Sequence, residues 1–207
     1  MELDERTLAS VAAYDAHATA YREALRLLRP VGDARRFADR ARRGDLVLDA
    51  ACGPANDLRL LRDVGLKPIG VDLSLGALLE ARMLLPFDPL VRAPLHDLPF
   101  APGSFAGLWL SSAFTHLPRR DWPATFEAVL PLLSRGPVYL SCYRGTVDLA
   151  PVDDPVLGAV YVSAALEDEV ERLFTTNGLV EVAVDLRPDP VLDRKRPWVT
   201  ALGTWRG

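Results

Sequence analysis

Three aspartates lie at or near the ends of short apolar runs. Asp49 lies in the run 46–50, Asp72 ends a second run, and Asp97 follows a third. An ionised carboxylate accepts hydrogen bonds and attracts a positively charged partner. One carboxylate at each of three successive strand ends therefore predicts a site for a nucleoside that carries a positive charge.

The turn after the first apolar run, residues 50–56, consists mostly of small residues. Small side chains let a ligand approach the backbone closely, and the N–H groups that open a following helix point toward it. Asp49 adds a negative charge beside this turn, which would repel a pyrophosphate but attract an ammonium or sulfonium group. The turn thus favours a cation-bearing cofactor over a dinucleotide.

Two further segments supply polar contacts for a nucleoside. Asp72 follows the turn at close to the spacing, about 20 residues, at which a carboxylate holds ribose hydroxyls. Hydrogen bonds to a charged acceptor contribute roughly 1.5 to 3 kcal/mol each. In the segment His96–Phe100, Asp97 can accept from an adenine amino group, with Leu98 beside the ring.

Hydrophobic spacing predicts the elements that position these residues. Helices are expected at 5–29, 33–43, 57–64, 74–83, 121–133 and 163–176, and strands at 46–50, 68–72, 90–92, 107–112, 138–143, 179–186 and 198–205. Asp33, Asp57 and Ser74 are expected to be helix N-caps. The alternation predicts an α/β fold with a doubly wound, mostly parallel sheet, and the last two strands, which no helix separates, should form a C-terminal antiparallel hairpin.

Composition narrows the class of protein. The 207 residues are 49% apolar with a net charge of -4, which predicts one domain over 1–207, with N-terminal helices at 1–43 and an α/β core at 44–207. The mild acidity argues against nucleic-acid binding, and the arginines between 35 and 43 are expected to form a solvated helix face.

Targeting and metal-binding signals are weak. The N-terminus lacks the basic and apolar segments of a secretory signal, and no run approaches the ~20 apolar residues of a membrane span. Cys52 and Cys142 lie far apart without ligand spacing, so neither a disulfide framework nor a metal site is expected. These features favour a cytoplasmic protein that does not bind membranes.

Three segments carry a family resemblance: VLDAACGPANDL at 47–58, PIGVDLSLGALLEAR at 68–82 and HDLPFAPGSFAGLWLSSAFTHLPR at 96–119. Their order and spacing resemble class I S-adenosylmethionine-dependent methyltransferases of small-molecule type. The resemblance covers about residues 10–205. It implies a Rossmann-like fold with a seven-stranded sheet, and methyl transfer from S-adenosyl-L-methionine to a small-molecule acceptor with S-adenosyl-L-homocysteine as product.

The resemblance also implies which residues touch the cofactor. They are Tyr14, Tyr21, Asp49, Ala51, Gly53, Pro54, Asp57, Asp72, Leu73, Ser74, His96, Asp97, Leu98 and Ser111. The turn would line the methionine end, Asp72 the ribose, and Asp97 with Leu98 the adenine. YDAHATAY at 14–21 resembles the N-terminal segment that covers the cofactor in such enzymes, although Tyr14 and Tyr21 also lie on an apolar helical stripe and could simply pack there.

The family turn usually has glycines where this chain has Ala51 and Ala55. If position 51 requires a positive φ, alanine costs on the order of 1 kcal/mol there.

Methyl transfer requires few catalytic groups from the protein. Methyl transfer from a sulfonium is an in-line displacement, and alignment contributes up to roughly 7 to 11 kcal/mol. A base helps only when the acceptor loses a proton, and His116 is the candidate catalytic residue, with His17 second. His116 could equally be a structural hydrogen-bonding residue or a cofactor contact.

Two other functions compete with methyl transfer. A nicotinamide-dependent oxidoreductase would need G-x-G-x-x-G, but the third glycine position is Asn56. A P-loop enzyme is disfavoured because no Gly-Lys-Ser/Thr follows the turn. The other alternative is a non-catalytic, degenerate cofactor-binding protein, because of the two alanines and the short segment 144–160.

Overall fold

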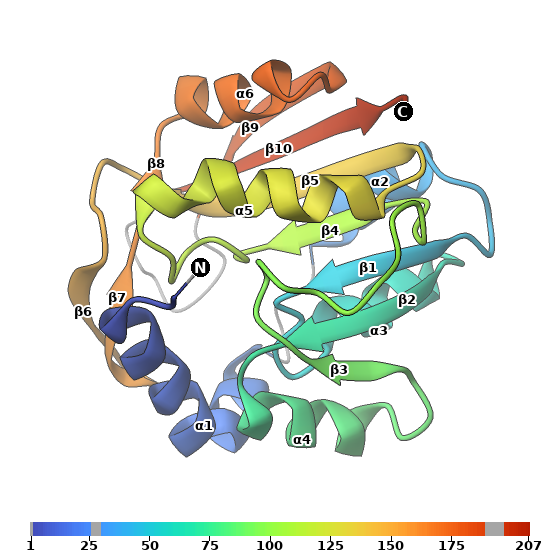
Figure 1. Ribbon diagram of the computed structural model, residues 1–207. Coiled ribbons are helices and arrows are strands. Elements are labelled where there is room, and N and C mark those ends of the chain that lie inside the picture. The colour runs from blue at the N-terminus through green and yellow to red at the C-terminus, as the bar shows by residue number, and fades with distance from the viewer. Residues whose placement is uncertain (1, 26–29, 189–196) are drawn as a thin grey trace.

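A mostly parallel β-sheet forms the middle layer of the molecule (Figure 1). The computed structural model describes residues 2–25, 30–188 and 197–207. The strands of the main sheet are β1 Leu46–Ala50, β2 Lys67–Asp72, β3 Leu90–Arg92, β4 Leu108–Ser111, β5 Gly136–Arg144, β8 Ala164–Ala165, β9 Val180–Arg187 and β10 Trp198–Trp205. In the described part of the chain, seven of them follow the order β3-β2-β1-β4-β5-β10-β9, and β8 pairs with β5.

The strand order confirms the predicted doubly wound sheet. From β1 the chain builds outward to β2 and β3, then returns to place β4 on the other side of β1. All these pairs are parallel, whereas β10 is antiparallel to both β5 and β9, as expected for a terminal hairpin. In such sheets ligands bind at the carboxyl ends of the strands where the winding reverses, which here is between β1 and β4.

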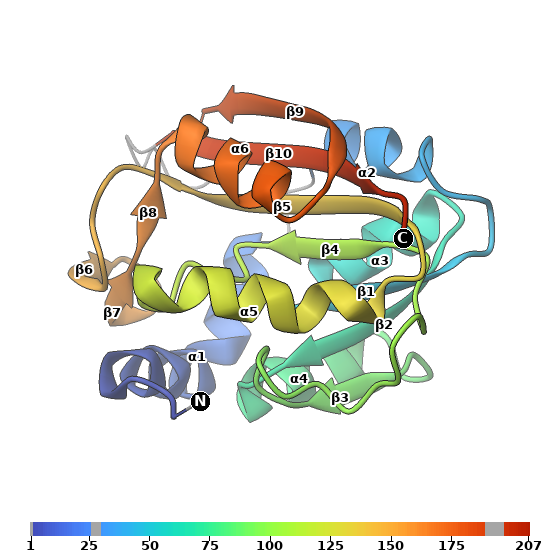
Figure 2. The same ribbon diagram turned by 45° about the horizontal axis from the view of Figure 1, so that its top comes forward.

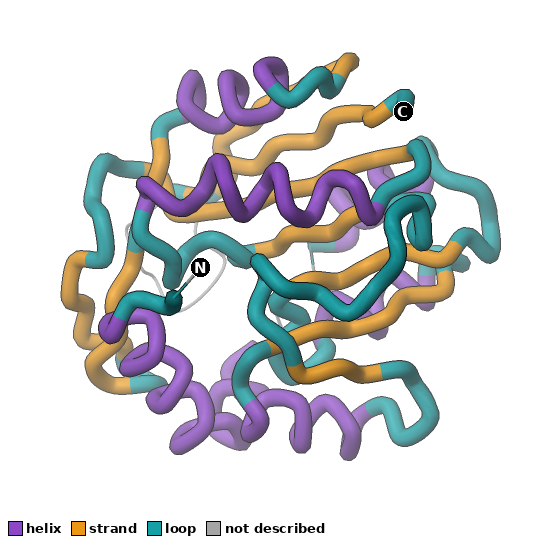
Figure 3. Tube along the Cα trace, in the orientation of Figure 1, coloured by secondary structure: helices purple, strands orange, loops and turns teal. Residues whose placement is uncertain are grey.

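Helices cover both faces of the sheet. They are α1 Glu5–Leu25, α2 Val31–Ala38, α3 Asn56–Asp63, α4 Leu75–Leu84, α5 Trp122–Val129 and α6 Glu167–Thr176, with short 3-10 turns η1 Arg119–Asp121 and η2 Leu130–Leu132 beside α5. When the molecule is turned, α5 and α6 lie over one face and α2 and α3 over the other (Figure 2). The loop from β3 to β4 crosses the sheet without a helix (Figure 3).

Each layer boundary holds its own apolar cluster. Phe126 of α5 and Phe174 of α6 are fully buried against one face. On the other face Trp109 stacks on Tyr139, with ring centroids 3.9 Å apart, and the ring of Phe37 of α2 lies nearly perpendicular to the indole, with centroids 5.3 Å apart. Trp109 is therefore a core residue, as its position in the strand predicts.

Several predicted element boundaries are wrong. The second helix runs from Val31 to Ala38 after Pro30, so Asp33 is not its N-cap; the Asp33 carboxylate instead pairs with Arg187 of β9, 2.9 Å away. Asp57 is not the N-cap of α3 either, because Ala55 precedes that helix in a left-handed conformation. Ser74 is confirmed as an N-cap, since its hydroxyl accepts from Ala77 N.

The segment after β5 holds an element that the sequence analysis missed. A two-stranded antiparallel hairpin, β6 Ala150–Asp154 and β7 Gly158–Val162, stands apart from the main sheet. The last helix consequently begins at Glu167 rather than near Ser163. The first helix has a break at His17, where φ is -120° and ψ is 18°, and the predicted end of that helix, 26–29, lies outside the described residues.

No helix within the described ranges has both the length and the apolar character needed to cross a membrane.

Candidate active site

The turn after β1 has an unusual backbone. Ala51, Gly53 and Ala55 all have positive φ, at 64°, 53° and 69°. Left-handed conformations cost an L-residue roughly 1 to 2 kcal/mol, so the two alanines hold a conformation that glycine would adopt with less strain. A Cβ built on Gly53 would meet nothing within 4 Å, which indicates open space beside the turn.

Three carboxylates surround this turn, of which Asp49 is buried and Asp57 and Asp72 are partly buried. Asp72 accepts from Gly53 N through Oδ2 and from Ser74 N through Oδ1, both at 2.8 Å. Asp57 accepts from Trp109 Nε1 at 2.9 Å. Oδ2 of Asp49 is buried and has no hydrogen-bond partner in the described part of the chain.

Burial makes this carboxylate cluster costly to ionise. It raises the pKa of Asp49 well above its ordinary value, and the charges of Asp57 and Asp72 raise it further. Burial also raises the pKa of Asp57 and of Asp72, although hydrogen-bond donors partly offset the effect at both. A cation bound here would relieve both the repulsion and the desolvation cost.

A cavity of about 880 Å³ adjoins the three aspartates. Its wall includes most of the predicted site residues: Tyr14, Tyr21, Asp49, Ala51, Gly53, Pro54, Asp57, Asp72, Leu73, Ser74, His96, Ser111 and His116. The carboxyl ends of β1, β2 and β4 and the first helix thus meet at one place.

Three predicted residues lie away from this wall. The loop after β3 contributes residues 93–96 to the cavity, whereas Asp97 and Leu98 are not among its lining residues. Asp97 is exposed, and Leu98 packs partly buried against the main core. His17 is also exposed and does not line the cavity.

Helix α1 lies between the β6–β7 hairpin and α4 (Figure 1). Its Asp15 accepts from Ser74 Oγ at 2.6 Å and from Gly76 N at 2.8 Å, at the start of α4. A Cβ on Gly76 would come within 2.8 Å of the Asp15 backbone, so glycine permits this close approach. Toward the hairpin, Ser10 Oγ accepts from Tyr161 N at 2.9 Å. Hydrogen bonds thus hold helix α1 to the start of α4 on one side of the cavity and to the β6–β7 hairpin on the other.

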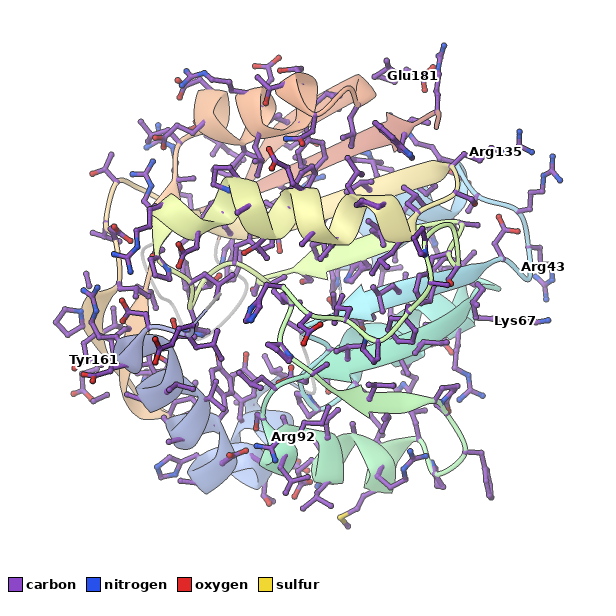
Figure 4. The ribbon with its side chains drawn as sticks, in the orientation of Figure 1. Arg43, Lys67, Arg92, Arg135, Tyr161 and Glu181 are labelled. Atoms are coloured by element: carbon purple, nitrogen blue, oxygen red, sulfur yellow. The ribbon has the colours of Figure 1, made fainter. Side chains whose placement is uncertain are left out.

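His116 and Tyr14 form a hydrogen-bonded pair on the cavity wall. His116 Nδ1 lies 2.7 Å from the Tyr161 carbonyl oxygen, which only accepts, so Nδ1 carries the proton. In the neutral ring Nε2 then has the free lone pair, and Tyr14 Oη, 2.9 Å away, donates to it. Burial lowers the pKa of His116, so the neutral ring persists below pH 6.5. Tyr161 itself lies at the outer edge of the hairpin (Figure 4).

The far side of the cavity was not predicted. It is built by the β6–β7 hairpin, through Val152, Leu157 and Val160, and by residues where β5, β9 and β10 meet, including Tyr143 and Trp198. The run GAVYV at 158–162 had a weak strand signal, but nothing local indicated that it would cover a cavity. Charged side chains such as Arg43, Lys67 and Arg135 lie at the opposite edge of the molecule (Figure 4).

Comparison with known proteins shows which sequences and structures this chain resembles. A family model described as a methyltransferase domain matches residues 47–136. Malonyl-[acyl-carrier protein] O-methyltransferase of Enterobacter lignolyticus (strain SCF1) is 36% identical over 105 residues, which cover 51% of this chain and 42% of that relative. The match thus spans less than half of the curated relative.

Solved methyltransferase structures share the fold over nearly the whole chain. The 1,6-didemethyltoxoflavin-N1-methyltransferase of Burkholderia thailandensis, with bound 1,6-didemethyltoxoflavin and S-adenosylhomocysteine, has a TM-score of 0.72 at 16% identity and covers 100% of this chain and 92% of its own. A putative methyltransferase of Haloferax volcanii, in complex with the Trm112 activator, has a TM-score of 0.72 at 22% identity, covering 95% and 97%.

The family model, the sequence relative and the common fold agree with the motifs at 47–58 and 68–82. Together, the methyltransferase domain matched at residues 47–136, the sequence relative and the common fold support a class I S-adenosylmethionine-dependent methyltransferase.

Proposed function

We propose that this protein binds S-adenosyl-L-methionine at the turn after β1 and transfers its methyl group to a small molecule bound in the adjoining part of the same cavity. One observation carries the proposal: Asp49 is 1% exposed, and its Oδ2 has no partner among the described residues. An unpaired buried carboxylate is strongly destabilising unless a cation or donor pairs with it. The amino acid end and the sulfonium of this cofactor supply positive charge.

Asp72 suits the ribose. A carboxylate offers about four lone-pair sites, and the two backbone donors at Gly53 and Ser74 leave acceptor capacity unused. We assign the adenine end to the segment 93–96, including His96, because this part of the loop lines the cavity. Tyr21 covers the cofactor from α1, and Tyr14 beside it faces the acceptor.

When bound, the cofactor supplies an electrophilic methyl group on a positively charged sulfur. The chain's own residues align the acceptor and remove its proton. The acceptor O–H or N–H gives its proton to Tyr14 Oη while Tyr14 gives its own to His116 Nε2, and the Tyr161 carbonyl holds the resulting imidazolium through Nδ1. Tyr14 is therefore the residue that meets the acceptor, and His116 is the base behind it.

Thermal unfolding in the presence of single ligands tests the proposal. S-adenosylmethionine and S-adenosylhomocysteine should each raise the melting temperature, whereas NAD and ATP should not, since a ligand at 100 times its Kd stabilises by ~2.7 kcal/mol. Asp72→Ala should remove the shift, because two charge-assisted bonds of roughly 1.5 kcal/mol or more each are lost. Asp168→Ala, on the exposed side of α6, is the matched control.

A shift with NAD instead would favour the oxidoreductase. Retained S-adenosylhomocysteine affinity in Asp72→Ala would refute the ribose assignment. A protein that binds both ligands but never consumes S-adenosylmethionine across phenols, amines, thiols and carboxylates would be the degenerate binding protein. The free, buried Cys52 and Cys142 support a reducing, cytoplasmic setting as part of the same proposal.

A further inference from the structure

Three residues form a row across three neighbouring strands at the acceptor end of the cavity. Trp198 of β10 is paired with Tyr143 of β5 on one side and with Arg187 of β9 on the other. Directly opposed residues of antiparallel strands project from the same face of a sheet. All three line the cavity. The Tyr143 and Trp198 rings lie 4.4 Å apart between centroids, tilted by 39°.

Two donors in this row have no acceptor among the residues that the structure describes. Trp198 Nε1 and Arg187 Nε are both shielded from water and have no hydrogen-bond partner in the described ranges. A buried donor without an acceptor is costly, and these two belong to directly paired residues. A ligand oxygen that reaches them would remove that cost, so the row is suited to an oxygen acceptor beside an aromatic surface.

The charges around this row determine whether the ligand oxygen that binds there is neutral or anionic. The Arg187 guanidinium already meets Asp33 at 2.9 Å and Asp185 at 3.5 Å. Arg36 contacts the same two aspartates, at 3.7 Å and 2.6 Å. Two arginines and two aspartates leave this network without net charge. The cavity wall also carries the carboxylates of the cofactor turn, so an additional anion would be repelled.

The aromatic content of the wall sets the shape of the ligand. Tyr14 and Tyr21 of α1 lie edge to face, with ring centroids 4.9 Å apart, and join Tyr143 and Trp198 on the cavity wall. Aromatic rings favour flat aromatic partners in stacked or edge-on arrangements. The Tyr14–His116 pair lies among these rings, where it can accept a proton from a bound ligand.

From this arrangement we infer that the acceptor is a neutral, flat aromatic molecule with two functional groups. A protic hydroxyl or ring N–H faces Tyr14, and a carbonyl oxygen binds Trp198 Nε1–H and Arg187 Nε–H at the other end. This inference rests on the proposed function, because the same cavity must hold the methyl donor.

Binding of three matched probes to the protein saturated with S-adenosylhomocysteine tests the inference. Para-hydroxyacetophenone has the carbonyl, para-ethylphenol has nearly the same shape without it, and para-hydroxybenzoate replaces it with a carboxylate. Titration calorimetry at pH 6.5 should show the ketone binding about tenfold more tightly than either other probe, the effect of one to two hydrogen bonds.

Trp198→Phe keeps the ring but removes the N–H, and should bring the ketone to within about twofold of para-ethylphenol. Trp205→Phe, the same change at the other end of β10 and away from the cavity, should keep the full difference. Equal affinities for the ketone and para-ethylphenol in the unaltered protein, or tighter binding of para-hydroxybenzoate, would overturn the inference.

The failures of the two proposals are distinguishable. If S-adenosylhomocysteine binds and no aromatic probe does, the acceptor class is wrong while the methyltransferase proposal stands. If S-adenosylhomocysteine itself fails to bind, both are wrong.

Discussion

The two ends of the cavity are built in different ways. The proposed cofactor end comes mainly from residues 46–76, a short stretch that contains two strand-to-helix turns and the carboxylates Asp49 and Asp72, with the loop segment 93–96 beside it. The proposed acceptor end combines α1, the β6–β7 hairpin and the row Tyr143, Trp198 and Arg187. One end is a local backbone structure, and the other is an assembly of distant segments.

Because of this difference, binding of the methyl donor and recognition of the acceptor depend on separate parts of the chain. The turn depends on left-handed backbone, small side chains and a buried negative charge, all of which suit one cationic ligand. The acceptor end depends on side chains that can be exchanged without disturbing the turn. Substitutions at the two ends should therefore change different measured quantities.

The largest effect should come from the proton-accepting pair. Tyr14→Phe and His116→Asn should each lower kcat by roughly 10² to 10⁴, the usual contribution of a positioned base. The affinity for S-adenosylhomocysteine should change little by comparison. The measurement is turnover of S-adenosylmethionine with para-hydroxyacetophenone, together with ligand titration.

Tyr161→Phe is the control for this pair, because His116 uses only the backbone carbonyl of Tyr161. An unchanged kcat in His116→Asn would show that the acceptor needs no base from the protein. If cofactor affinity fell by the same factor as kcat, the Tyr14–His116 pair would belong to the cofactor end, and the two ends of the cavity would not have separate roles.

A smaller effect is expected from Asp49→Asn. Removing a buried charge beside a sulfonium should weaken S-adenosylmethionine binding by about 10- to 100-fold, as for loss of a charged hydrogen-bonding partner. S-adenosylhomocysteine lacks the sulfonium charge, so its affinity should fall less. Titration of both ligands gives the ratio, and an equal loss for the two would mean that Asp49 does not recognise the charged sulfur.

The same carboxylate should contribute to the pH dependence of the ligand-free protein, in the same direction as Asp57 and Asp72, whose pKa values are also raised, and against His116, whose pKa is lowered. The pKa of Asp49 is raised on folding from its ordinary value of 3.8, so the folded state holds more protons above that pH. Stability should therefore fall as the pH rises from about 4 through the raised pKa, and S-adenosylmethionine affinity should rise over the same range.

Melting temperatures at a series of pH values measure this trend. Asp49→Asn, which resembles the protonated side chain, should flatten it. A wild-type protein whose stability rises relative to that of Asp49→Asn between pH 5 and pH 8 without ligand would contradict the assignment.

The smallest effect concerns the strained turn. Ala51→Gly relieves a φ of 64° and should stabilise by up to about 1 kcal/mol, or roughly 2 to 4 °C in Tm. Ala81→Gly, at a fully buried position within α4, should destabilise by at least about 0.5 to 1 kcal/mol, because glycine is unfavourable inside a helix and a buried methyl group is lost. If both substitutions destabilise, the turn is not strained in the way that its φ values indicate.

The sequence was sufficient for features that neighbouring residues determine. The strand and helix alternation, the small-residue turn at 50–56 and the Ser74 cap depend on contacts within a few residues, and the structure has them where expected. Asp49 and Asp72 follow from the same local rule, because parallel strands bring their carboxyl ends to one edge.

Tertiary structure decided everything that depends on pairing between distant segments. Asp57 and Asp33 were predicted to cap helices. Their carboxylates instead bind Trp109 of β4 and Arg187 of β9, which lie far away in the chain. The path of the loop after β3 set which of its residues face the cavity. The register of β10 against β5 and β9 likewise placed Trp198 between Tyr143 and Arg187, and no local pattern encodes a register between strands so far apart in the chain.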